Sequence, residues 1–226
     1  MIERVPSGIP GLDELIEGGF VKGSINLVAG TTGTCKTTFC TQFIWHGLQN
    51  NEPGVYVTVE QEAEEIIRSS KRFGFDFEPY IQQGKCLFID CMPESLKELE
   101  KVVFDSIVKL DAKRFVLDSL TVALLGLREI KDPALLRREV FRFSKRLKAL
   151  GVTSLLISEV PETQPKALTR FGFEEFIADG VIVLYFLEYS AGSRTRSLII
   201  RKMRNTDHAV DVFPFQLTEN GIVVKT

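Results

Sequence analysis

The feature that most constrains this chain is a short glycine- and threonine-rich segment at residues 30–37, Gly-Thr-Thr-Gly-Thr-Cys-Lys-Thr. An apolar run at 25–29 precedes it, and a run with helical character at 39–48 follows it. The segment fits the pattern G-x-x-x-x-G-K-[ST] at every defined position except Cys35, where the pattern has glycine. We therefore predict a tight turn from a buried strand into a helix.

Such a turn directs unpaired backbone N–H groups and the positive end of the helix dipole at one point, which suits a phosphate group. Lys36 would then reach the β- and γ-phosphates of a nucleotide, and the Thr37 hydroxyl would ligate Mg²⁺. The alternative is an ordinary strand-to-helix turn. The predicted phosphate-binding residues are Gly30, Thr31, Thr32, Gly33, Thr34, Cys35, Lys36, Thr37 and Thr38.

Cys35 raises two hypotheses. If the loop needs the dihedral angles of glycine here, a β-carbon costs about 1–2 kcal/mol and crowds the γ-phosphate, so that binding survives while turnover falls. The second hypothesis is that the neighbouring N–H groups lower the pKa of the thiol and make it oxidisable.

Length and composition indicate one α/β domain. The 226 residues suffice for one well-packed core and are few for two, so we expect a single domain over residues 1–226. The net charge of -2 gives no sign of a nucleic-acid-binding protein. The sequence contains neither an apolar run long enough to cross a bilayer nor a signal-peptide core, so we expect no membrane association and a cytoplasmic location.

Hydrophobic periodicity predicts alternating strands and helices, then strands alone. The expected strands are 25–29, 55–59, 86–90, 114–118 and 152–157, with helices at 36–50, 62–73, 95–110 and 133–150. After a polar loop at 160–174, strands are expected at 177–187, 195–203, 210–213 and 222–224. This order predicts a mostly parallel sheet flanked by helices with an antiparallel C-terminal extension. Residues 6–24 are expected to form a surface lead-in.

Polar side chains follow three of the expected parallel strands and should meet the phosphate loop at one sheet edge. They are Glu60, Asp118 and Ser158. Asp118 suits the magnesium-side carboxylate, although an Asp at a strand end also serves as a helix cap. Glu60 is a candidate general base, and the alternative is an exposed residue in the first turn of a helix.

A cluster of cations lies at 201–208, near the end of an antiparallel strand. It could neutralise transition-state charge on a phosphate, from within the chain or from a neighbouring subunit. The alternative is a charged edge strand that limits aggregation.

Taken together and in order, several segments resemble the KaiC branch of the RecA-type ATPases. They are residues 7–15, the phosphate loop, Glu60, 117–119, 170–176, the Lys-x-Arg-x-x-x-His pattern from 202 to 208, and 213–215. The resemblance spans nearly the whole chain, and residues 7–15 and 202–208 are its most specific parts. It implies a RecA-like P-loop NTPase fold, ATP with Mg²⁺, and a homo-oligomeric ring, usually a hexamer, with nucleotide between subunits.

The resemblance also implies a role for each site residue. Lys36 and Thr37 would bind phosphate and metal, Asp118 would support the metal, and Glu60 would activate water. Three residues would contact the ATP of the neighbouring subunit, namely Lys202, Arg204 and His208.

The chain departs from the family pattern in two further places. Gln61 follows the expected catalytic glutamate where the family commonly has a second glutamate. Glu175 and Phe176 stand where self-phosphorylating domains carry Ser and Thr, so the chain resembles the ATPase type of domain. The clock protein of the family has two such domains, and this chain has one.

Three functions remain open. The first is a slow, oligomeric ATPase whose nucleotide state controls assembly or the binding of an unidentified protein partner. The second is a nucleotide-binding signalling module that does not hydrolyse ATP because of Cys35. The third is a DNA-recombination relative, and we predict against it because loops 121–132 and 160–174 hold few basic or aromatic residues. Those residues are Arg128, Lys131, Lys166, Arg170 and Phe171.

Overall fold

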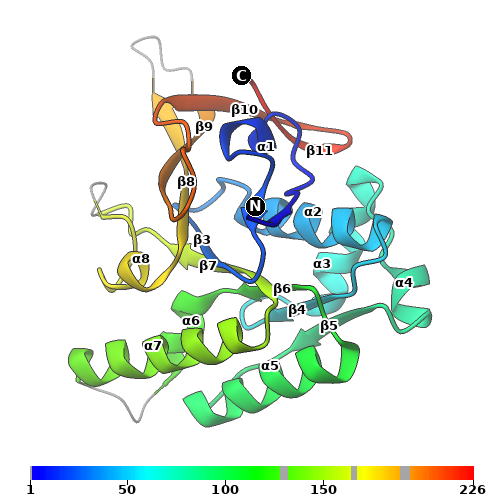
Figure 1. Ribbon diagram of the computed structural model, residues 1–226, viewed down its shortest axis with the longest axis vertical. Coiled ribbons are helices and arrows are strands. Elements are labelled where there is room, and N and C mark those ends of the chain that lie inside the picture. The colour runs from blue at the N-terminus through cyan, green and yellow to red at the C-terminus, as the bar shows by residue number, and fades with distance from the viewer. Residues whose placement is uncertain (1, 128–131, 164–166, 189–193) are drawn as a thin grey trace.

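A nine-stranded sheet with the order β11-β10-β9-β8-β3-β7-β6-β4-β5 organises the chain. The computed structural model describes residues 2–127, 132–163, 167–188 and 194–226. The strands of this sheet are β3 (Ile25–Gly30), β4 (Gly54–Thr58), β5 (Cys86–Asp90), β6 (Arg114–Asp118), β7 (Thr153–Glu159), β8 (Gly180–Glu188), β9 (Arg194–Met203), β10 (Val212–Thr218) and β11 (Gly221–Val224). Strands β3 to β8 pair in parallel, and β9, β10 and β11 add antiparallel pairs (Figure 1). The predicted fold class is confirmed.

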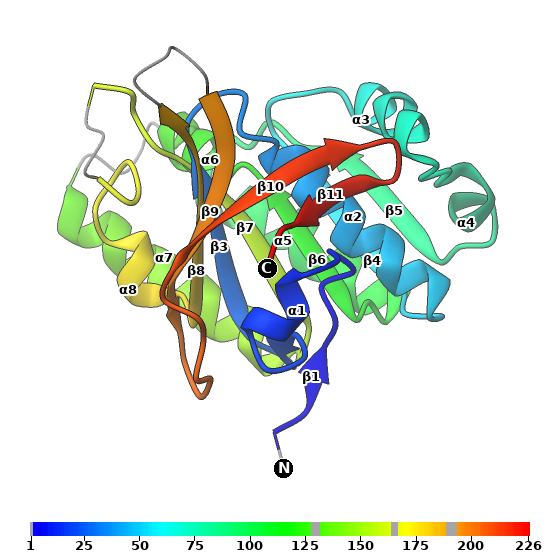
Figure 2. The same cartoon turned by 90° about the horizontal axis from the view of Figure 1, so that it is seen from above.

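Two layers of helices bury the two faces of the sheet (Figure 1). The helices are α1 (Leu12–Leu15), α2 (Lys36–Gln49), α3 (Ala63–Ser70), α4 (Glu78–Gln82), α5 (Leu96–Leu110), α6 (Leu120–Gly126), α7 (Pro133–Ala149) and α8 (Glu174–Ile177), with a 3-10 turn at Lys71–Phe73. Apolar side chains of α2 pack on one face, and those of α5, α6 and α7 pack on the other. The β10–β11 hairpin lies across α2, so this helix is covered on both sides (Figure 2).

The prediction of a surface lead-in is wrong. Residues 4–21 form the two-stranded sheet of β1 (Arg4–Val5) and β2 (Phe20–Val21) and the short helix α1. Ile9 and Leu12 are buried in the same core as α2. Gly11 adopts φ 81°, and a β-carbon there would lie 2.4 Å from the carbonyl oxygen of Val224, so the segment is pressed against β11. Its many turn residues permit this close packing.

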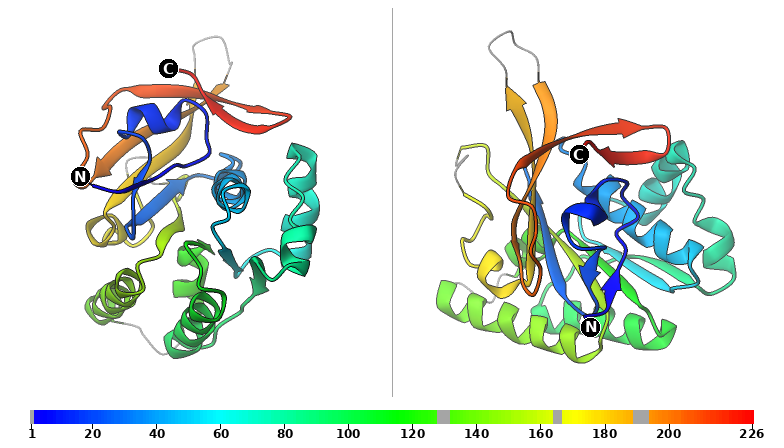
Figure 3. Two further views of the ribbon diagram at one scale, coloured as in Figure 1. Left: turned by 45° about the vertical axis from the view of Figure 1, so that its right-hand side comes forward. Right: turned by 45° about the horizontal axis from the view of Figure 1, so that its top comes forward.

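The expected strand at 177–187 begins later than predicted. Ile177 ends the short helix α8, and β8 starts at Gly180. Helix α6 was also not predicted, because its apolar residues follow β6 almost directly and show no amphipathic period. Strands β8 and β9 continue as a long antiparallel ribbon, drawn in yellow and orange in Figure 3.

A buried arginine joins the lead-in, α2 and the sheet. The Arg114 side chain is 1% exposed, and its Nε donates to Glu52 Oε2 at 2.6 Å. Its Nη1 donates to the carbonyl oxygens of Pro6 at 2.9 Å and Phe43 at 2.8 Å. A β-carbon on Gly47 would lie 2.4 Å from Arg114 Cδ, so the glycine makes room for this side chain. All three elements therefore depend on one buried charge.

We predict that Glu52→Gln lowers the free energy of unfolding by about 3 kcal/mol, because it leaves the buried Arg114 cation without its carboxylate. Urea unfolding followed by circular dichroism measures the change. Glu3→Gln is the matched control: it removes one partner of the exposed Lys22–Glu3 pair and should cost less than about 1 kcal/mol. Equal effects of the two variants would contradict the assignment.

Candidate active site

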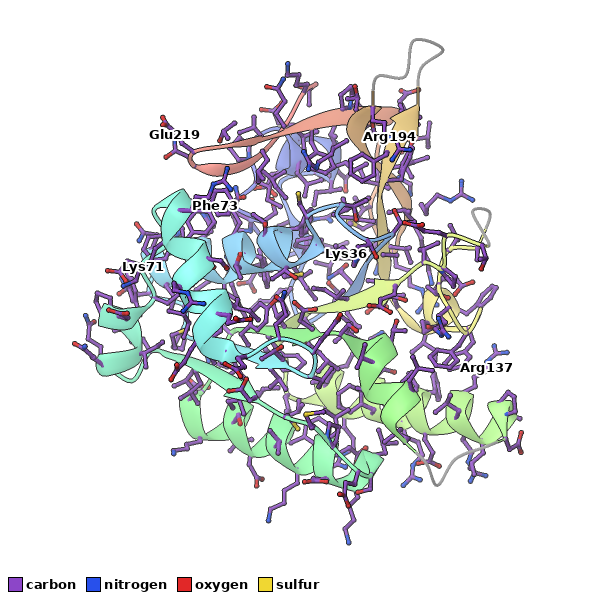
Figure 4. The ribbon with its side chains drawn as sticks, turned by 180° about the vertical axis from the view of Figure 1, so that it is seen from behind. Lys36, Lys71, Phe73, Arg137, Arg194 and Glu219 are labelled. Atoms are coloured by element: carbon purple, nitrogen blue, oxygen red, sulfur yellow. The ribbon has the colours of Figure 1, made fainter. Side chains whose placement is uncertain are left out.

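The segment between β3 and α2 forms the predicted loop. Gly30 must be glycine, because a β-carbon there would lie 2.5 Å from the carbonyl oxygen of Leu184. Thr34 Oγ1 donates to the carbonyl oxygen of Thr31 at 2.8 Å and closes the turn. Lys36 begins α2 at the end of the loop, near the middle of Figure 4. The first-turn N–H groups of a buried helix therefore face the loop, as an anion site requires.

Cys35 adopts a backbone conformation that favours glycine. Its φ of 69° and ψ of 31° lie in the left-handed region. The loop therefore keeps the backbone angles that glycine would adopt, and the β-carbon of Cys35 makes this conformation less stable. Burial raises the pKa of the Cys35 thiol, and the nearby Arg196 and Lys36 only oppose the rise. The hypothesis of a lowered thiol pKa is therefore wrong.

The first turn of α2 is bonded to the end of β6. Thr37 Oγ1 donates to Asp118 Oδ2 at 2.9 Å, and the Tyr56 hydroxyl donates to the same oxygen at 2.6 Å. Asp118 is 6% exposed. Burial raises the pKa of its carboxyl, while the hydrogen bonds from Tyr56 and Thr37 oppose the rise.

This arrangement fits a magnesium site. A hydroxyl has one proton and two lone pairs, so Thr37 can donate to Asp118 and still offer oxygen lone pairs to a cation. Among the described residues, no group of three or more His, Cys, Asp or Glu side chains could hold a metal ion alone. Mg²⁺ does not need such a cage, because it usually keeps waters and binds one or two protein oxygens plus substrate phosphates.

The structure brings Lys36, Asp118 and Glu60 into one charged cluster. The Lys36 ammonium donates to the carbonyl oxygen of Thr31 at 2.9 Å. Burial lowers the pKa of this lysine, and the charges of Glu159, Asp118 and Glu60 oppose the fall. Glu60 is exposed just beyond β4, and its pKa is raised by partial burial and by the charges of Glu159 and Asp118. These groups are close enough for their charges to affect one another.

Glu159 belongs to this cluster and was not predicted. It is the last residue of β7 and pairs with Gly30 in the parallel ladder. Ser158, the residue expected to reach the ligand, is fully buried and lies 3.5 Å from Thr121 Oγ1. Successive residues of a strand point to opposite faces, so Ser158 and Glu159 cannot both face the loop. Every residue of β7 before Glu159 is buried, so the sequence offers no alternation to count, and the pairing with Gly30 identifies Glu159.

The structure places Lys202, Arg204 and His208 at the opposite end of the sheet. Met203 pairs with Gly180, whereas the loop begins beside Leu184. Four residues of strand separate these two levels, which corresponds to about 13 Å. Lys202 donates to two backbone carbonyl oxygens of the α8 region, Arg204 lies 3.3 Å from Asp179, and the His208 ring contacts the Ala209 carbonyl oxygen. The three do not join the loop of their own chain.

The structure covers the loops that were considered for DNA only in part. Arg128, Lys131 and Lys166 lie outside the described residues, Arg170 is exposed and Phe171 is half-buried. In the described ranges, none of the helices is long and apolar enough to cross a membrane.

Comparison with known proteins gives a consistent result. The family model described as the KaiC ATPase matches residues 5–226. A UPF0273 protein of Thermotoga maritima is 36% identical and matches 99% of this chain and 96% of its own length. The circadian clock oscillator protein KaiC of Prochlorococcus marinus is 35% identical over 99% of this chain, which spans 45% of that relative.

The solved structures give the same answer. The crystal structure of a KaiC-like protein from Pyrococcus horikoshii superposes with a TM-score of 0.90. That protein is 40% identical, and the match covers 100% of both chains.

We predict that Cys35→Gly raises the free energy of unfolding by about 1 kcal/mol, because glycine adopts the left-handed region without a β-carbon penalty. Urea unfolding without nucleotide measures the change. Cys35→Ala keeps the β-carbon and should give no comparable gain. Equal stabilisation by Ala and Gly would show that the thiol, and not the backbone angle, causes the cost.

Proposed function

Because the chain belongs to the KaiC family of ATPases, we propose that it hydrolyses ATP slowly in a Mg²⁺-dependent reaction, within a homo-oligomeric ring. The nucleotide state of the ring would control assembly or the binding of a protein partner. The observation that carries this proposal is the Thr37–Asp118 hydrogen bond beneath the loop, with Lys36 and Glu60 beside it.

The geometry supports a role for each group. The loop N–H groups and Lys36 would hold the β- and γ-phosphates. Thr37 and Asp118 would hold Mg²⁺, which neutralises charge on the phosphate oxygens. Glu60 would accept a proton from the attacking water while the oxygen of that water bonds to the γ-phosphorus. The bond from the γ-phosphorus to the bridging oxygen then breaks and ADP leaves.

The raised pKa of Glu60 suits a general base. Partial burial and the negative charges of Glu159 and Asp118 move its pKa upward from the ordinary range of a carboxyl group. A base is more effective when its pKa approaches the working pH. Glu159 also supplies a second carboxylate beside the loop, where Gln61 cannot.

The distant cations support a site shared between subunits. Lys202 and Arg204 are anchored to α8 and Asp179, at the far end of the sheet from their own loop. Arg4 of β1 donates to Thr206 Oγ1 at 2.6 Å and holds the same segment. A head-to-tail ring would bring this segment of one subunit to the loop of the next.

A module that binds ATP without hydrolysis is the second candidate. Cys35 is the observation that favours it, because a residue with a side chain stands where the phosphate-loop pattern has glycine. The preserved left-handed angle and the intact cluster of Lys36, Glu60 and Asp118 favour the ATPase.

We predict that Mg-ATP shifts the sedimenting species to a ring and that the same samples release phosphate. Glu60→Gln should still form the ring with Mg-ATP while phosphate release falls at least about 100-fold, as expected for loss of a general base. Analytical ultracentrifugation and a phosphate-release assay measure both. A ring without turnover in the wild type would favour the signalling module, and a monomer indifferent to ATP would contradict both candidates.

We predict that two inactive variants complement each other when mixed. An Arg204→Ala subunit keeps its own Glu60 but cannot supply Arg204 to its neighbour, and a Glu60→Gln subunit has the opposite defect. A functional site therefore needs the loop of an Arg204→Ala subunit next to the Arg204 of a Glu60→Gln subunit. Random 1:1 mixing should restore about a quarter of the wild-type rate if subunits contact head to tail. Each variant mixed with itself is the control, and no recovery in mixed rings would show that Arg204 does not act on the site of the neighbouring subunit.

A further inference from the structure

A tyrosine hydroxyl reaches the magnesium-side carboxylate from inside the core. Tyr56 is fully buried, and its hydroxyl donates to Asp118 Oδ2 at 2.6 Å. Its ring stacks on Phe88, with centroids 5.0 Å apart and planes 15° from parallel. The side chain is therefore fixed by packing on one side and by a charged acceptor at its tip.

The strand register explains how Tyr56 reaches this carboxylate. Tyr56 pairs with Val116, and Thr58 pairs with Asp118, so Tyr56 and Asp118 are diagonal neighbours on adjacent parallel strands. They lie two residues apart in register and therefore on the same face of the sheet. An aromatic side chain is long enough to span such a diagonal.

Two donors converge on one oxygen of Asp118. Thr37 Oγ1 donates to Oδ2 from α2, and the Tyr56 hydroxyl donates to Oδ2 from β4. Two fixed donors on the same atom prevent the carboxylate from turning, so its other oxygen, Oδ1, keeps one direction. Partners of this kind orient metal-binding groups and affect metal affinity.

We propose that Tyr56 is a positioning residue of the magnesium site: its hydroxyl fixes the orientation of Asp118 and thereby strengthens Mg²⁺ binding with ATP. The inference rests on the proposed function, because it assigns Asp118 to the metal. Filling the core does not require the hydroxyl, since phenylalanine would occupy nearly the same volume. The hydroxyl adds its hydrogen bond to Asp118 and an interaction with the Thr37 side chain.

The test is Tyr56→Phe, with the affinity for a fluorescent ATP analogue measured in EDTA and over a series of Mg²⁺ concentrations. Affinity in EDTA should stay within about twofold of the wild type, because the loop and Lys36 are untouched. The Mg²⁺ concentration that gives half of the metal-dependent gain in affinity should rise about 10- to 100-fold, the usual effect of losing such a partner. Thermal unfolding of each variant confirms that it is folded.

Tyr80→Phe is the matched control. The Tyr80 hydroxyl accepts a hydrogen bond from Gln49 Nε2 at 3.1 Å on the exposed side of α2, so its loss should leave the Mg²⁺ dependence unchanged. A second test repeats Tyr56→Phe in an Asp118→Asn background. If Tyr56 acts through Asp118, the second substitution should then change the Mg²⁺ dependence by less than about twofold.

The outcomes separate the inference from the proposed function. A wild-type chain whose affinity for the ATP analogue does not depend on Mg²⁺ would overturn both. Mg²⁺-dependent binding in the wild type with an unchanged Mg²⁺ dependence in Tyr56→Phe would overturn the inference alone, as would a full effect of Tyr56→Phe in the Asp118→Asn background.

Discussion

Strand β6 holds α2 at two points, and the site depends on both contacts. Its last residue, Asp118, accepts a hydrogen bond from Thr37 in the first turn of the helix. Its first residue, Arg114, donates to the carbonyl oxygen of Phe43 farther along the helix. The carboxylate lies at the positive end of the helix dipole, so the first contact is electrostatically favourable, and the second joins a buried cation to a carbonyl oxygen in the middle of the helix. The loop before α2 is therefore held by the strand that ends in Asp118, the proposed metal-side carboxylate.

The surroundings of α2 make this alignment rigid. The Gln42 amide donates to the carbonyl oxygens of Gly8 and Ile222 and accepts from the N–H of Ile222. The lead-in and the C-terminal hairpin thus bind the same side chain, although they lie at opposite ends of the sequence. This explains why the lead-in is buried, and why segments far from the loop in sequence belong to the same functional unit.

Much of the fold could be predicted, because long apolar runs and amphipathic helices leave clear periods in the sequence. The start of α2 and the end of β6 were predicted correctly. These two boundaries give the positions of Lys36, Thr37 and Asp118. The prediction was wrong for the lead-in, where an interaction between distant segments decides the conformation. It was also wrong for Ser158, because a shift of one residue along β7 decides which face of the sheet a side chain lies on, and Glu159 lies on the face of the loop. Tyr56 was hidden in a continuous apolar strand, and only the register reveals its partner.

The charge balance of the candidate site bears on the proposed ring. Three carboxylates, those of Glu60, Asp118 and Glu159, act on the single ammonium of Lys36. ATP brings more negative charge than one Mg²⁺ neutralises, so the bound nucleotide would increase the imbalance. Arg196 lies beside Cys35 at the loop, whereas Lys202 and Arg204 are fixed by α8 and Asp179 at the far end of the sheet. A neighbouring subunit could supply them, and nucleotide binding would then favour the ring because the ring completes the site's charge.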